Sequence, residues 1–199
     1  MPRRRQFPAA AVDVRVVAGR PPRPDGARPA FTMAAVARWI PAYVALGSNL
    51  DAPQRQVERA FEALDRLPQS RLVLRSALYR SAPLGPVDQP DFVNAVAGLL
   101  TRLDPVQMLE QLQDCEQRLG RAAPVVRWGP RRIDLDLLVH GDVLCQGEQL
   151  TLPHPGIAAR AFVLAPLADI APHLLVPGLG RVAELLHRVE TIGLERLAP

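Results

Sequence analysis

Two aspartates, Asp134 and Asp136, stand one residue apart in the alternating stretch 131–137, RRIDLDL. On a strand, residues two apart share a face, so both carboxylates project together and the apolar residues between them face the core. Two carboxylates roughly 6–7 Å apart at their Cα atoms can jointly hold Mg²⁺ or bridge two ions about 3.5–4 Å apart. The alternative is an ordinary solvent-facing strand surface. Because Asp is a poor strand former, two of them in one short strand favour the metal site.

A third carboxylate, Glu116, falls within the apolar stripe of a helix predicted over 105–119. The stripe follows the spacing i, i+4, i+7, i+11, i+14, and Glu116 is its fourth member. A carboxylate in such a position is costly unless it is paired or binds a ligand. Gln113 lies beside it, three residues earlier. The alternative is that Glu116 reaches the edge of the stripe or pairs with an Arg.

Four arginines gather in the loop between this helix and the aspartates. They are Arg121, Arg127, Arg131 and Arg132, with Trp128-Gly129-Pro130 among them. Guanidinium forks bind phosphate oxygens while a metal takes others, which suits a polyphosphate complexed with Mg²⁺. Such a loop could close over the reaction and exclude water. Alone it could be a solvated basic loop, but beside Asp134 and Asp136 it favours phosphoryl transfer.

Phe92 and Asn94 suggest a second substrate, because they share one face of a predicted strand. A flat ring could stack on Phe92 while the Asn94 amide donates and accepts hydrogen bonds at the ring edge. The loop 83–86, PLGP, precedes this strand. The alternative is a core Phe beside an Asn that favours a turn.

Of the four histidines, only His154 lies in a distinctive setting. It stands in the sequence 152–155, LPHP, and is followed by Arg160 and Phe162, so it could contact a phosphate or a nucleotide. No His/Cys spacing typical of zinc is present.

The two cysteines are too few for a disulfide scaffold, which indicates a reducing, cytoplasmic setting.

The length of 199 residues suits one domain plus a tail, with a core large enough to be stable. All 24 basic residues are Arg, which excludes a Lys Schiff base, a P-loop lysine and a Lys general base. The apolar runs are all broken well short of about 18 residues, so no membrane span is expected.

The net charge of +4 is unevenly distributed. Residues 1–40 carry +6 and the remaining residues carry −2. This Arg/Pro-rich extension shows no sustained periodicity and is predicted to be disordered, with 41–199 as the folded domain. It could be a transit peptide, or a dispensable extension upstream of Met33. The acidic body has no general basic footprint for nucleic acid.

Periodicity and turn residues predict the elements that must position these side chains. Asp51 is the expected N-cap of the first helix, and Leu72, Leu74 and Leu78 are expected on one face of the second strand. The main elements are a strand at 42–46 ended by Gly47-Ser48-Asn49, a helix from Asp51 to Pro68, strands at 71–80 and 92–100, a helix opened by Asp104 and closed near Gly120, and a strand at 133–139. A hairpin at 142–152, a short helix near 156–160 and a last helix near 179–189 follow.

The order β-α-β-β-α-β predicts an α+β fold, a ferredoxin-like sandwich with an antiparallel sheet and an extra C-terminal hairpin and helices. Both main helices should cover one face of the sheet. The other face is then left for ligands and the C-terminal elements.

Several of these motifs together resemble the 6-hydroxymethyl-7,8-dihydropterin pyrophosphokinases of folate biosynthesis. The similar segments are 43–50 (YVALGSNL), 79–86 (YRSAPLGP) with 88–95 (DQPDFVNA), 127–131 (RWGPR) with Asp134-Leu135-Asp136, and 152–155 (LPHP) with Arg160 and Phe162. They span about 42–190 in the family's order and spacing. The family has nothing that matches 1–40.

The resemblance implies an ATP-dependent diphosphotransferase. The pterin hydroxymethyl oxygen would attack the β-phosphorus of MgATP, and AMP would leave. The expected partners are two Mg²⁺ ions, ATP as co-substrate and the pterin, with no nucleic acid and no membrane. A cytoplasmic monomer is expected.

The resemblance also implies roles for particular residues. Asp134 and Asp136 would bind the two Mg²⁺ ions, and Arg121 and Arg131 would stabilise the transferring phosphates. The nucleotide contacts would be Gln113, Glu116, Arg127, Arg131, His154 and Arg160. The pterin pocket would comprise Ser81, Ala82, Leu84, Phe92, Asn94, Trp128 and Phe162, with Phe92 and Phe162 on the two faces of the ring.

The sequence departs from the family's pattern at a few positions. The loop 122–126, AAPVV, lacks the extra Lys or Arg common there. Pro155 stands where an aromatic residue is usual, and Gln149 where a basic residue often lies. These differences bear on nucleotide affinity and loop closure.

Two other functions compete with this one. A nucleotidyltransferase could use the same carboxylates to transfer AMP, and it would release pyrophosphate. A nucleic-acid-binding module would use the basic extension, and its affinity would depend on salt and be lost on deleting 1–40. The acidic body and the lack of aromatics interleaved with the arginines of the extension argue against the second.

Overall fold

The computed structural model describes residues 14–15, 38–85, 88–120 and 129–198. The predicted disorder of 1–40 falls almost wholly outside these residues and stays a prediction. In the part that is described, no helix is long and apolar enough to cross a membrane.

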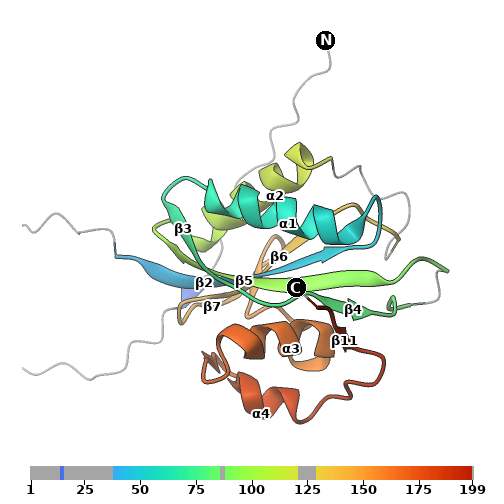
Figure 1. Ribbon diagram of the computed structural model, residues 1–199. Coiled ribbons are helices and arrows are strands. Elements are labelled where there is room, and N and C mark those ends of the chain that lie inside the picture. Colours follow the sequence, from blue (N-terminus) through green and yellow to red (C-terminus); the bar gives the residue numbers. More distant parts are fainter. Residues whose placement is uncertain (1–13, 16–37, 86–87, 121–128, 199) are drawn as a thin grey trace, which may run out of the picture.

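An antiparallel sheet forms the centre of the molecule (Figure 1). Its long central strands β2 and β5 pair along their whole length, from Ile40 opposite Thr101 to Ser48 opposite Val93. From one edge to the other the strands are β11 (Glu195–Arg196), β4 (Tyr79–Ser81), β5 (Phe92–Thr101), β2 (Ile40–Ser48) and β6 (Asp134–His140), and β3 (Ser70–Arg75) also pairs with β5. This arrangement confirms the predicted ferredoxin-like sandwich with its antiparallel sheet.

Helices α1 (Pro53–Asp65) and α2 (Pro105–Arg118) cover one face of the sheet, as predicted (Figure 1). Their apolar stripes pack against the strands in a fully buried cluster that includes Phe61, Leu64 and Leu112. Asp104 caps α2 by accepting the N–H groups of Val106 and Gln107, each at 2.9 Å. Such a cap satisfies donors that the first turn of a helix leaves unpaired.

Helices α3 (Ala161–Ile170) and α4 (Val182–Leu186) lie on the opposite face (Figure 1). They pack there on a second buried cluster that includes Val96, Leu138 and Leu164. The smaller elements are β1 (Val14–Arg15), β7 (Leu144–Gln146), β8 (Thr151–Leu152), a 3₁₀ turn (Ile157–Ala159), β9 (Leu175–Val176) and β10 (Gly180–Arg181). The hairpin β7–β8 and the 3₁₀ turn confirm the predictions for 142–152 and 156–160.

Asp51 is not the N-cap of α1, contrary to the prediction. Ala52 occupies that position with a left-handed φ of 61°, and no side chain caps the helix. The Asp51 carboxylate instead accepts a hydrogen bond at 2.9 Å from the Arg132 guanidinium, 81 residues away. A tertiary ion pair has therefore replaced the local cap.

The strand predicted at 71–80 is two strands, and Leu74 does not share the face of Leu72 and Leu78, which both pack against the core. A bulge between Leu72 and Leu74 shifts the register, so that Leu72 lies opposite Leu99 and Leu74 opposite Gly98. Adjacent residues of β5 point to opposite faces, so the bulge turns Leu74 away from the core that Leu72 contacts. Leu74 is 40% exposed as a result.

The sequence analysis missed α3 and made the last helix too long. The α3 sequence, AFVLAPLADI, is apolar at almost every position and contains Pro166. It therefore shows no stripe of period 3.6 and carries a helix-breaking residue, although burial on the sheet stabilises it as a helix. The helix predicted near 179–189 is confined to Val182–Leu186.

Candidate active site

The pairing of three strands sets the geometry of the site. Gly47 of β2 lies directly opposite Asn94 of β5 on one side and Asp134 of β6 on the other. Ala45, two residues earlier on β2, lies opposite Asp136. Residues directly opposite each other share a face, so all five are on the face turned away from α1 and α2. The small residues of β2 leave room between the carboxylates and the amide.

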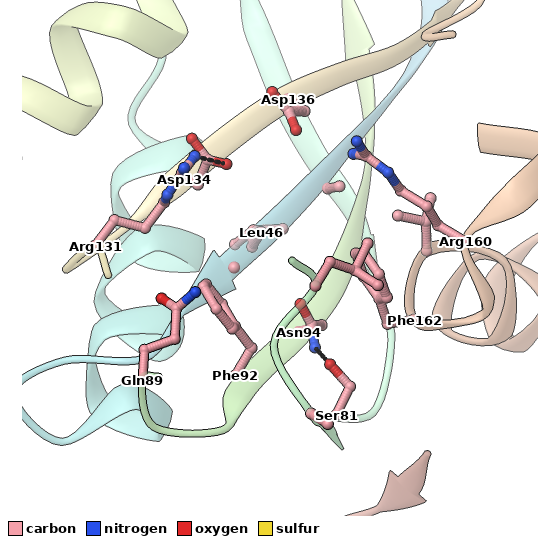
Figure 2. A pocket seen from close by; sticks show the side chains of 15 residues that line it. Leu46, Ser81, Gln89, Phe92, Asn94, Arg131, Asp134, Asp136, Arg160 and Phe162 are labelled. Atoms are coloured by element: carbon pink, nitrogen blue, oxygen red, sulfur yellow. Dashed lines mark hydrogen bonds and ion pairs between the residues drawn. The ribbon is translucent and has the colours of Figure 1, made fainter. Parts of the chain in front are cut away.

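A pocket opens on this face, at the end of the sheet near α3 (Figure 2). One side holds charged groups and the other holds aromatic, amide and hydroxyl groups, as Figure 2 shows. The lining residues are Ala45, Leu46, Gly47, Ser81, Ala82, Leu84, Gln89, Phe92, Asn94, Arg131, Asp134, Asp136, Arg160, Phe162 and Val163.

The two aspartates lie on the charged side, as predicted. Leu135 between them is buried in the core, which confirms the alternation read from the sequence. Arg131 pairs with Asp134 at 2.7 Å, and Nε2 of His154 lies 3.9 Å from the Asp136 carboxylate. Burial, and next the charge of Asp134, raise the pKa of Asp136, while His154, Arg160 and Arg131 oppose the rise. A cation bound between two such close carboxylates would offset their mutual repulsion.

His154 is held at the rim of this charged side. Its backbone N–H donates to the Leu138 carbonyl at 2.9 Å, and its Nδ1 accepts the N–H of Gly156 at 3.0 Å. Burial lowers the pKa of His154, Arg160 lowers it further, and the charge of Asp136 opposes both. The fixed Nδ1 directs Nε2 toward the carboxylates.

Glu116 lies behind the aspartates and does not line the pocket. It is 5% exposed, and its Oε1 accepts the N–H of Leu135 at 2.7 Å. The carboxylate in the apolar stripe of α2 is therefore bonded to the backbone of β6. Gln113 lies on the same helix and is exposed.

The other side of the pocket carries the aromatic and amide groups. Phe92 begins β5 and Phe162 lies in the first turn of α3, so the two rings come from opposite walls (Figure 2). The Asn94 amide donates to Oγ of Ser81 at 3.0 Å. The Arg160 guanidinium lies 5.9 Å from the centre of the Phe162 ring, at the junction with the charged side.

Most of the predicted site residues come together in this pocket. They are Ser81, Ala82, Leu84, Phe92, Asn94, Arg131, Asp134, Asp136, Arg160 and Phe162. Arg121, Arg127 and Trp128 lie outside the described residues, so their roles stay predictions. Gln113, Glu116 and His154 do not line the pocket. His154 lies beside Asp136 of the pocket, and Glu116 bonds to Leu135, the core residue between the two aspartates.

The sequence analysis missed Ala45, Leu46, Gly47, Gln89 and Val163. Ala45 and Gly47 carried a usable signal, because two small residues on one face of a central strand leave space above the sheet. Gln89 and Val163 carried none, since only the tertiary fold brings them to the pocket.

The charged side suits Mg²⁺ bound together with a phosphate. The described residues contain no group of three or more His, Cys, Asp or Glu able to hold a metal by themselves. Mg²⁺ is usually bound by one or two carboxylates together with water and substrate phosphates, and Asp134 and Asp136 provide two carboxylates. The donor set therefore fits a magnesium–polyphosphate complex.

Comparison with known proteins decides the family. Residues 43–172 match the family model described as 7,8-dihydro-6-hydroxymethylpterin-pyrophosphokinase (HPPK). The chain belongs to the HPPK family. It is 51% identical over 155 residues to 2-amino-4-hydroxy-6-hydroxymethyldihydropteridine pyrophosphokinase of Pseudomonas aeruginosa, which covers 78% of this chain and 95% of that protein. The Haemophilus influenzae protein of the same name is 43% identical over 160 residues, covering 80% and 99%.

Solved structures support the HPPK fold. The wild-type HPPK-DHPS of Plasmodium falciparum matches with a TM-score of 0.59 at 14% identity, covering 76% of this chain. The match covers 45% of that longer chain, so this HPPK corresponds to less than half of it. The family and the fold predicted from the sequence are thus both confirmed, as is the class of enzyme, an ATP-dependent diphosphokinase.

Proposed function

We propose that this chain transfers the diphosphate of MgATP to the hydroxymethyl oxygen of 6-hydroxymethyl-7,8-dihydropterin and releases AMP, a step of folate biosynthesis. The two-sided pocket is the observation that carries the proposal. An aromatic and amide side suits a flat heterocycle, and a side with two carboxylates and arginines suits a polyphosphate.

The pterin is assigned to the aromatic side. Phe92 and Phe162 stack on the two faces of the ring, and Asn94 with Ser81 bonds its polar edge. Ala82 and Leu84 contact its apolar surface, and the resemblance to the family assigns Trp128 to the same pocket. This places the hydroxymethyl group toward Asp134 and Asp136.

The triphosphate is assigned to the charged side. Asp134 and Asp136 would hold two Mg²⁺ ions, which when bound neutralise phosphate charge and orient the phosphate chain. Arg131 and Arg121 bind the oxygens of the transferring phosphates, and Arg160 binds an oxygen near the pterin. Gln113, Glu116, Arg127 and His154 complete the nucleotide side, with Glu116 acting through its bond to Leu135.

The chemistry is an in-line displacement that depends on positioning and charge neutralisation. No covalent protein intermediate is required, because the pterin oxygen is itself the nucleophile. We propose further that the enzyme acts in the cytoplasm as a monomer.

The test is to incubate the purified protein with MgATP and 6-hydroxymethyl-7,8-dihydropterin and to resolve the nucleotide products. AMP that forms only with the pterin, in step with a pterin diphosphate, is the expected result. Pyrophosphate together with an adenylylated acceptor would indicate a nucleotidyltransferase instead. ADP would indicate transfer of a single phosphate.

A further inference from the structure

Asn49 follows directly on β2 and does not line the pocket, although its hydrogen-bond partners Arg131 and Gln89 do. Its side chain is almost fully buried, with 2% of the residue exposed. A buried amide has two N–H groups and a carbonyl oxygen to satisfy, so its partners reveal what it holds together.

On one side Asn49 is joined to Arg131. The Asn49 side-chain oxygen accepts the Arg131 backbone N–H at 2.8 Å, and the Asn49 backbone N–H donates to the Arg131 carbonyl at 3.1 Å. This reciprocal pair fixes the backbone of Arg131. The guanidinium of the same residue pairs with Asp134 at 2.7 Å, on the charged side of the pocket (Figure 2).

On the other side Asn49 is joined to the segment that leads into β5. Its Nδ2 donates to Oε1 of Gln89 at 3.0 Å and to the carbonyl of Pro90 at 3.1 Å. Gln89 lines the pocket beside Phe92, as Figure 2 shows. The two N–H groups of one amide therefore hold the segment that carries the aromatic side.

The neighbouring Ser48 differs in its contacts. It is fully buried, and its Oγ donates to the Arg132 carbonyl at 2.6 Å. Among the described residues, its other side-chain hydrogen bond is to the Leu50 carbonyl of its own turn, at 3.5 Å. Ser48 thus anchors the Arg131–Arg132 backbone without touching the segment before β5.

We propose that Asn49 is a positioning residue that couples the two substrate sites. The proposal rests on the assignment of pterin to the aromatic side and of MgATP to the charged side. A ring that orders Gln89 and Phe92 fixes the acceptors of the Asn49 amide, and the amide in turn fixes Arg131 against the phosphates. Such coupling is reciprocal, so bound nucleotide tightens pterin binding by the same factor as pterin tightens nucleotide binding.

The experiment measures the dissociation constant of 6-hydroxymethyl-7,8-dihydropterin by calorimetry, with and without saturating Mg²⁺ and α,β-methylene-ATP. The ratio of the two constants is the coupling factor. For the unaltered chain we expect a factor in the range of about 5 to 150 that is typical of coupled sites. Asn49→Ala and Asn49→Asp should both bring the factor close to one. The Asp variant keeps an acceptor for Arg131 and loses the donors to Gln89 and Pro90.

Two further variants separate coupling from folding. Gln89→Ala removes one acceptor at a half-buried position, so it should fold normally and still lower the factor. Ser48→Ala removes the buried bond to the Arg132 carbonyl and should leave the coupling factor unchanged. In addition, kcat at saturating substrates should fall in Asn49→Ala more than in Ser48→Ala. Only the Asn49 variant breaks the link between Arg131 and the segment that carries Gln89.

An unchanged coupling factor in Asn49→Asp and Gln89→Ala would overturn the proposal, and so would a factor of one in the unaltered chain. Product analysis separates this failure from a failure of the proposed function. If the unaltered chain makes AMP and a pterin diphosphate while the variants keep full coupling, only the coupling role is wrong. If it makes neither product, the assignment of the two sites is wrong and the coupling role with it.

Discussion

Glu116 of α2 accepts the backbone N–H of Leu135 at 2.7 Å, and Leu135 is the residue between the two aspartates that line the pocket. The bond joins a buried carboxylate on one face of the sheet to the strand that presents Asp134 and Asp136 on the other face. The position of both aspartates therefore depends on a side chain that does not line the pocket.

Replacing Glu116 should lower the stability of the fold. Glu116→Ala leaves the buried N–H of Leu135 without this acceptor, so the free energy of unfolding should fall by about 1–3 kcal/mol. Glu116→Gln keeps an acceptor oxygen, so its free energy of unfolding should fall less. Urea unfolding measures the stability of both variants. Glu110→Ala, at an exposed position on the same helix, is the control. Equal stability of Glu116→Ala and the control would contradict a structural role for this bond.

Loss of either aspartate should remove most of the activity. Asp134→Ala or Asp136→Ala should lower kcat by at least ~10²–10³, the scale seen when one preorganised charge stabiliser is lost. Chelation of Mg²⁺ should abolish turnover, and added Mg²⁺ should restore it. Asp142→Asn, at an exposed turn just after β6, should retain turnover. Normal kcat in either alanine variant would rule out the metal assignment.

Phe92→Ala should weaken pterin binding and leave nucleotide binding nearly unchanged. Stacking of a flat heterocycle on an aromatic side chain is worth roughly 1–3 kcal/mol, which corresponds to a rise of about 5-fold to 150-fold in the pterin dissociation constant. Calorimetry with each substrate separately measures the two effects. Leu175→Ala, an exposed position outside the pocket, is the control. Pterin affinity equal to that of the control would refute the stacking role.

His140 should make the fold less stable in acid. It is 1% exposed, and burial lowers its pKa from the ordinary 6.5, although its bond to the Leu103 carbonyl and the charge of Asp104 oppose this shift. The unfolded chain therefore takes up the proton at a higher pH than the folded chain. As the pH falls below about 6.5, stability is lost until the folded pKa is reached, at ~1.4 kcal/mol per unit of difference.

The measurement for His140 is the urea midpoint between pH 7.5 and pH 5. His140→Gln should lose less stability over this interval than the unaltered chain, because its amide does not titrate. His173→Gln, at an exposed position, should follow the unaltered chain. Parallel pH profiles for all three proteins would exclude His140 as the source of the acid sensitivity.

Local pattern was enough to predict the central elements of the fold. The alternation in 131–137 placed Asp134 and Asp136 on one face and Leu135 in the core, and the strands β2, β5 and β6 and the helices α1 and α2 were found near their observed bounds. These features follow from the periods of strands and helices, which each segment carries in its own sequence. The motifs that resemble the family added the identities of most pocket residues.

Local pattern failed where a distant segment decided the outcome. Asp51 pairs with Arg132, 81 residues away, while Ala52 stands at the N-cap of α1. A bulge against β5 sends Leu74 to the opposite face from Leu72. The apolar helix α3 is stable only because the sheet covers it, so its sequence has no amphipathic stripe to reveal it.

The sequence by itself therefore determined the family, the chemistry of the two sides of the site and the order of the main elements. The tertiary structure alone decided that Gln89 and Val163, from distant parts of the chain, line the same pocket as Asp134. It also decided that Asn49 bonds to both Arg131 and Gln89. Bonds between residues tens of positions apart depend on strand register and helix docking, and no local period encodes either of them.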